Sequence, residues 1–182
     1  MSNDAKGWRR LIPRYEVPRL PGMTRREKVA LVIGTGLGTG FMKPMAPTWG
    51  SIPGFVYFAA VSRLLPMWAG VGIFAGMLIP AVWSGTICER LLGGKDPRAV
   101  VIDEIAAVPF ALWPLWVHWP GHWVTWVWLF GVYRVMDYLK PWPANRMEGL
   151  KGGVGIMMDD VVSSAYMGLG LWGLSMWAGW LL

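Results

Sequence analysis

The sequence predicts an all-α, polytopic integral membrane protein: a helical bundle of about four or five spans preceded by a glycine-rich segment. Hydrophobic residues make up 54% of the 182 residues, whereas charged residues make up only 15%, well below the usual quarter. The mean hydropathy is +0.39, and a soluble domain of this size could not bury so much apolar surface. The charges also gather in short clusters between apolar runs, as expected for spans joined by loops. This composition excludes a disordered chain, a collagen-like chain and, with a single cysteine, a disulfide scaffold.

The chain opens with a basic tail at residues 1–28, which holds eight Lys or Arg and three Asp or Glu. No apolar stretch of the kind found in a signal peptide lies within it. We expect this tail on the cytoplasmic side, where it either retains anionic lipid or serves only as a topology signal. Residues 29–182 are then expected to form one membrane-embedded domain. Its first part, 29–42, is short and contains four glycines, which predicts a re-entrant or surface-lying segment.

Stronger apolar segments follow, and we expect a helix in each of them. The segments are 52–65, which is short for a span, 68–88, 97–117, 123–138 and 161–182. Proline and glycine predict loops at 43–51 and 142–158, and charged residues predict one at 89–98. At the start of the third helix, Asp96 and Pro97 are typical of an N-cap and a first helical position. Pro109 and Pro114 predict bends in that helix.

The positive charges predict the orientation of these spans. If the basic tail is cytoplasmic and each segment crosses once, only Arg63 of the 17 Lys and Arg lies near the outer face. This distribution obeys the positive-inside tendency and leaves most tryptophans for the outer interfacial belt. The net charge of +6 is therefore concentrated in cytoplasmic loops rather than spread over a surface. We expect a membrane partner and no nucleic-acid partner.

Five of the eleven acidic residues lie within or against the apolar segments. They are Asp103, Glu104, Asp137, Asp159 and Asp160. A carboxylate in such a position is costly unless it faces the protein interior or water and has a partner. The predicted topology brings all five to one depth near the cytoplasmic surface, from three different helices. Because converging carboxylates repel one another unless a cation compensates, the pattern predicts a magnesium site.

A simpler interpretation exists for each pair of acids taken alone. Asp159 and Asp160 are suited to capping a helix, where negative charge is favoured. Arg134 and Asp137 have the i, i+3 spacing of an ordinary helix salt bridge. Neither interpretation explains why three separate acidic sites share one depth, and this coincidence favours the metal site.

Basic residues accompany the acids. Arg134, Lys140 and Lys151 are placed to contact a phosphate on the same side of the membrane. The glycine run at 152–155 would allow backbone N–H groups to approach an anion, although it lacks the spacing of a P-loop. Acidic metal ligands and basic phosphate contacts at the cytoplasmic surface indicate a phosphate-bearing lipid headgroup as substrate.

Three stretches of the chain resemble the phosphatidylglycerophosphatase A family. They are VVIDE at 100–104, RVMDYLKPWP at 134–143 and GGVGIMMDD at 152–160. The resemblance runs from about residue 31 to about residue 166. It implies a bacterial inner-membrane, Mg²⁺-dependent hydrolase of phospholipid metabolism. Such an enzyme removes the terminal phosphate of phosphatidylglycerophosphate to give phosphatidylglycerol.

The resemblance also implies roles for individual residues. It marks the five acids as the metal and catalytic group, and Arg134, Lys140 and Lys151 as phosphate contacts. Thr48 and Ser51 match a family loop of the form P-G-T-x-G-S, from which the first two positions depart here, and they join the implied phosphate contacts. The pattern does not assign the base. Metal-activated water and an aspartyl-phosphate intermediate both fit, and we favour water because the D-x-D-x-T pattern of aspartyl-phosphate enzymes is absent.

Two other classes of function are weighed against this one. The CDP-alcohol phosphotransferase motif D-x2-D-G-x2-A-R and the K-x6-R-P motif of type-2 phosphatidic acid phosphatases are both absent from the sequence. An ion or proton transporter would place its acids near mid-bilayer between repeats. Here the acids are predicted near one surface, and the sequence shows no internal repeat.

Overall fold

The fold was analysed in a computed structural model that describes residues 22–42, 46–116, 121–147 and 149–178. Within these residues the regular structure is entirely helical, which confirms the all-α class. The α-helices are α1 Arg25–Gly34, α2 Ala46–Leu64, α3 Met67–Leu92, α4 Ile102–Leu112, α5 Trp123–Leu139, α6 Ala144–Met147 and α7 Gly153–Ala178. Two short 3₁₀ helices, Thr39–Phe41 and Trp113–Trp116, follow α1 and α4.

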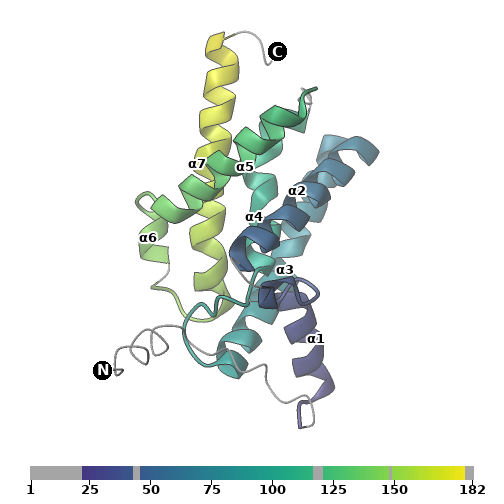
Figure 1. The fold of residues 1–182 in the computed structure, drawn as a ribbon, viewed down its shortest axis with the longest axis vertical. Helices are drawn as coiled ribbons and strands as arrows, with labels where there is room; N and C mark the ends of the chain where they lie inside the picture. The colour runs from purple at the N-terminus through teal and green to yellow at the C-terminus, as the bar shows by residue number, and fades with distance from the viewer. Residues whose placement is uncertain (1–21, 43–45, 117–120, 148, 179–182) are drawn as a thin grey trace, which may run out of the picture.

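Helix α4 occupies the centre of the bundle, between α2 and α7 (Figure 1). Every residue of α4 except Phe110 is buried, as expected for a helix that is apolar on all sides after the two acids of its first turn. One apolar cluster surrounds its first turns and includes Val101 and Ile156. A second, aromatic cluster surrounds its end and includes Phe58 and Tyr133. The position of α4 therefore brings its first turn close to α2, α3 and α7.

The start of α4 differs from the prediction. Asp96 is not an N-cap: its φ is +49°, in the left-handed region, and the helix begins only at Ile102. The intervening backbone bonds elsewhere, because the Val101 N–H donates to the Gly34 carbonyl at 2.9 Å and the Val100 N–H donates to Pro97 at 2.7 Å. Contact with α1 thus replaces the first turn of the predicted helix.

The predicted loops at 43–51 and 142–158 are also partly helical. Helix α2 begins at Ala46, and α7 begins at Gly153, eight residues before the predicted start. Glycine permits the second change because a Cβ at Gly153 would lie 2.0 Å from the Val82 carbonyl oxygen of α3. The Gly153 N–H donates to the Thr86 hydroxyl at 2.8 Å, so a backbone contact with α3 defines where α7 begins.

The structure does not confirm four or five spans. Among the described residues, one helix, Met67–Leu92, is long and apolar enough to cross a membrane by length and composition. The glycine-rich segment 29–42 forms the end of α1, a turn and a 3₁₀ helix. Most of the basic tail, residues 1–21, lies outside the described residues, whereas 25–28 form the first turn of α1.

The close approach of α7 to α3 gives a stability prediction. Gly153→Ala should destabilise the protein by about 1–3 kcal/mol, because the added methyl group would overlap the α3 backbone. Gly170→Ala in the same helix has no atom within 4 Å of its new Cβ. It should be neutral or stabilise the protein by up to about 1 kcal/mol. Thermal unfolding of the purified variants measures both effects, and equal melting temperatures would contradict the packing described here.

Candidate active site

Three helices contribute the five acids. Asp103 and Glu104 lie in the first turn of α4, and Asp137 lies in the last turn of α5. Asp159 and Asp160 lie in the second turn of α7, so they do not cap that helix and the capping interpretation is wrong. All but Asp137 are buried, and the residue exposures of the buried four range from 2% to 7%. The bundle therefore brings acids that are far apart in the sequence into one largely buried region.

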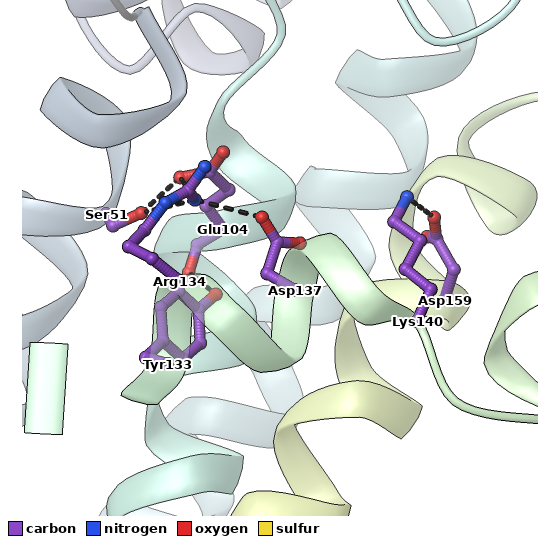
Figure 2. A network of polar contacts seen from close by, with 7 residues as sticks. All are labelled: Ser51, Glu104, Tyr133, Arg134, Asp137, Lys140 and Asp159. Atoms are coloured by element: carbon purple, nitrogen blue, oxygen red, sulfur yellow. Dashed lines mark hydrogen bonds and ion pairs between the residues drawn. The ribbon is translucent and has the colours of Figure 1, made fainter. Parts of the chain in front are cut away.

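Arg134 is the centre of the first polar network (Figure 2). Its Nη1 lies 3.1 Å from Glu104 Oε2 and 3.0 Å from Asp137 Oδ2, and it donates to Ser51 Oγ at 3.1 Å. The Ser51 hydroxyl in turn donates to the Glu104 carboxylate. The Tyr133 hydroxyl donates to the Glu104 backbone carbonyl at 3.4 Å. One guanidinium thus joins α2, α4 and α5, and the i, i+3 salt bridge is part of this larger network.

Lys140 forms the second network, on the far side of Asp137 in Figure 2. Its Nζ pairs with Asp159 Oδ2. Lys140 ends α5 with φ +38°, and its own N–H bonds the Met136 carbonyl. This left-handed end turns the chain away from α5 and carries the ammonium group to α7. Arg134 and Lys140, six residues apart, therefore bring cations from one helix end to acids of the two neighbouring helices.

The two cations leave part of the negative charge uncompensated. Asp103 Oδ1 and Asp159 Oδ1 are buried without a hydrogen-bond partner among the described residues. Asp159 and Asp160 precede the long apolar part of α7. Burial raises the pKa of Asp160, and the charges of Asp103 and Asp137 raise it further. Burial also raises the pKa of Asp159, although Lys140 opposes that shift. Repulsion of this kind is relieved when the acids bind either protons or a further cation.

The donor chemistry fits a hard divalent cation, but the present arrangement does not enclose one. Carboxylate oxygens are the ligands that Mg²⁺ prefers, and two of them are unpartnered here. Within the described part of the chain, no three His, Cys, Asp or Glu side chains are grouped as a metal site would require. Glu104, Asp137 and Asp159 instead contact Arg134 and Lys140.

Two of the predicted phosphate contacts lie apart from these networks. Lys151 is exposed in the loop before α7, and Thr48 is half-buried in the first turn of α2. Among the described residues, no hydrogen bond or ion pair joins either of them to the five acids. The glycine run begins α7, and Gly152 and Gly155 line a cavity of about 270 Å³ together with Asp159.

Sequence reasoning missed Asp96 as a part of this region. Asp96 and Lys95 line the same 270 Å³ cavity. The charge of Asp96 acts on both Asp103 and Asp159. Tyr133 was also missed, because a tyrosine in an apolar helix resembles any other core aromatic. For Asp96, the available signal was its short separation from Asp103 in the sequence, which is less than the length of two helical turns.

Together, the helical bundle and the buried acids beside Arg134 and Lys140 define the class, an all-helical protein with a charged site inside an apolar bundle. Comparison with known proteins identifies the family within that class. The chain belongs to the phosphatidylglycerophosphatase A family, whose model matches residues 32–175. This match confirms the resemblance found in the three sequence stretches.

Three relatives align with the chain over most of their length, and two of them carry the family's name. A putative phosphatidylinositol-3-phosphatase of Bacteroides thetaiotaomicron is 34% identical over 149 residues, 79% of this chain and 92% of the relative. The phosphatidylglycerophosphatase A of Haemophilus influenzae is 29% identical over 80% of this chain and 88% of its own. The Escherichia coli phosphatidylglycerophosphatase A is 27% identical over 72% and 75%, respectively. No solved structure matches the chain.

Proposed function

We propose that this protein is a lipid phosphatase that hydrolyses phosphatidylglycerophosphate to phosphatidylglycerol and phosphate. The observation that carries the proposal is the gathering of acids from α4, α5 and α7, all but Asp137 buried, around Arg134 and Lys140. This gathering lies in a chain that the family model matches over residues 32–175. The names of two relatives support the substrate. We further propose that Mg²⁺ is the cofactor and that the site faces the cytoplasm.

In this proposal Arg134 and Lys140 bind the phosphate of the lipid headgroup. Glu104 and Asp137 orient the Arg134 guanidinium from two sides, and Ser51 adds a hydroxyl that both accepts and donates. A guanidinium held in this way presents its remaining N–H groups in a fixed plane, which suits a phosphate oxygen pair. The acids alone would repel a phosphate dianion, so the cations must lie between the acids and the phosphate.

Asp103, Asp159 and Asp160 are the carboxylates proposed to hold Mg²⁺, which requires their side chains to come closer together than in the present arrangement. They repel one another, and two of their oxygens have no hydrogen-bond partner in the described part of the chain. A bound Mg²⁺ would supply charge neutralisation and a water of lowered pKa. We favour attack by water over an aspartyl-phosphate intermediate, because Asp137 already pairs with Arg134 and the other three carboxylates would be occupied by Mg²⁺.

A second substrate is favoured by one comparison. The relative that is 34% identical is named a putative phosphatidylinositol-3-phosphatase. Phosphatidylinositol-3-phosphate and phosphatidylglycerophosphate are both lipid phosphate monoesters, and the site described here would contact the phosphate of either. They differ in the alcohol that bears the phosphate, so an assay with both lipids separates the two functions.

We propose that the protein crosses the bacterial inner membrane several times, with its N-terminus in the cytoplasm. Large apolar side chains of α5 support this proposal because they form a continuous exposed face. They are Val124, Val127, Trp128, Val132 and Val135. Exposed apolar surface on this scale marks a contact with lipid or with another protein. The candidate span α3 provides a further apolar helix of sufficient length.

The first prediction concerns the acids and the substrate. Purified protein should release phosphate from phosphatidylglycerophosphate, and Asp160→Asn should lower kcat by about 100-fold or more while the helical content is kept. Glu89→Gln, at the end of α3, should retain normal turnover as the matched control. Faster release from phosphatidylinositol-3-phosphate would favour the second substrate. Near-normal turnover of Asp160→Asn would show that the acids are misassigned.

The second prediction concerns the metal. Excess chelator should abolish activity, and added Mg²⁺ should restore it. A readout independent of turnover is thermal stability, because a ligand that binds only the folded state raises the melting temperature. Mg²⁺ should therefore stabilise the chelator-treated wild type, and this gain should be lost in Asp103→Asn. Undiminished activity in excess chelator would overturn the assignment of Mg²⁺.

The third prediction concerns orientation. An amine reagent that cannot cross the inner membrane should leave Lys95 and Lys151 unlabelled in intact spheroplasts and should label them after lysis. Arg63→Lys introduces an amine near the predicted outer face and should be labelled in intact spheroplasts, which controls for reagent access. Labelling of Lys95 or Lys151 in intact spheroplasts would invert the proposed topology.

A further inference from the structure

An apolar groove of about 420 Å³ lies between α2 and α5. Its lining residues are Ile52, Phe55, Val56, Ala59, Trp126, Val127 and Phe130. On α2 they begin directly after Ser51, and on α5 they end one turn before Arg134. The two helices therefore lead from the charged network into an apolar channel. At about 1.5 Å per helical residue, the part along α2 is about 10 Å long.

We propose that this groove binds an acyl chain of the lipid whose phosphate contacts Arg134. The inference rests on the proposed function and names the part of the substrate that the polar site does not recognise. A phospholipid carries a charged headgroup joined to apolar chains. The groove and the Arg134 network present the complementary surfaces in the same order along both helices. A lipid could thus enter sideways between α2 and α5, with its phosphate at Arg134 and its chain along Val56 and Val127.

The floor of the groove is built by Phe55. Its ring lies 5.4 Å from Phe130, 6.5 Å from Trp126 and 5.8 Å from Tyr133, measured between centroids, in edge-on contacts. These contacts bridge α2 and α5 from behind and leave the outer edges open. Val56 and Val127 at those edges are 63% and 59% exposed. The groove is therefore a lined surface channel rather than a closed part of the core.

The chemistry of the lining favours an acyl chain over a peptide segment. A bound peptide carries backbone N–H and C=O groups that need hydrogen-bond partners when they leave water. The groove is lined by aliphatic and aromatic residues. Apart from the indole N–H of Trp126, their side chains supply no hydrogen-bond partners. An acyl chain has no such requirement, and it gains van der Waals contacts with the lining.

The experiment fills the groove at its open edge. Val56→Trp should lower kcat/KM for dioleoyl phosphatidylglycerophosphate about tenfold more than for the dihexanoyl lipid, in the same detergent. Val132→Trp is the matched control, because Val132 is also an exposed valine but lines a neighbouring apolar depression of α5 that shares only Val127 with the groove. It should change the ratio between the two substrates little. Circular dichroism checks the fold, and Ala59→Leu provides a smaller obstruction if Val56→Trp fails to fold.

The outcomes separate the groove from the proposed function. If Val56→Trp and Ala59→Leu affect both chain lengths equally, or Val132→Trp shifts the ratio as strongly, the acyl-chain assignment is wrong. The phosphatase function then stands as long as the wild type hydrolyses phosphatidylglycerophosphate. If the wild type releases no phosphate from either chain length, the proposed function itself fails, and the acyl-chain assignment fails with it.

Discussion

The burial of acidic side chains in an apolar bundle is the constraint on which the rest of this structure depends. Removing a carboxylate from water costs several kcal/mol unless cations and hydrogen bonds compensate. Helix α5 supplies both cations, Arg134 and Lys140, at the end that meets the first turns of α4 and α7. Asp103 and Asp159 nevertheless each keep an oxygen that has no hydrogen-bond partner among the described residues. Apolar residues at this place would make the fold more stable. The presence of desolvated carboxylates there is therefore best explained by function.

The apolar segments and their helical structure were predictable because both depend on residues that are close together in the sequence. The boundaries were not, because distant contacts decide them. Helix α4 begins directly after Val101, whose N–H donates to the Gly34 carbonyl, and no pattern near residue 101 contains that contact. Gly153 begins α7 because only a glycine fits against Val82 of α3. A run of glycines predicts a loop by propensity, whereas here one of them permits two helices to approach closely.

The residues of the candidate site also divide into those that the sequence predicted and those that depend on tertiary contacts. The five acids were identifiable because ionisable groups stand out in apolar segments, and the i, i+3 spacing of Arg134 and Asp137 predicted their salt bridge. Ser51 had no such signal of its own and was found only through the family loop. Asp96 was concealed by Pro97, since the pair resembles a helix start. Its proximity to Asp103 and Asp159 follows from the turn at 97–101, which is a tertiary feature.

The groove and the acids of α4 are connected by a chain of side-chain contacts, and this connection determines which substitutions are informative. Phe55 contacts Tyr133, and Tyr133 bonds the Glu104 carbonyl. A change at Phe55 would therefore move the first turn of α4 as well as the groove floor, and any loss of activity would be ambiguous. Val56 points its exposed side chain to the outer edge and does not take part in that chain of contacts. Recognition of the acyl chain can thus be tested separately from the placement of the acids only by substitutions at the groove edge, because the side chains there do not hold α2 and α5 together.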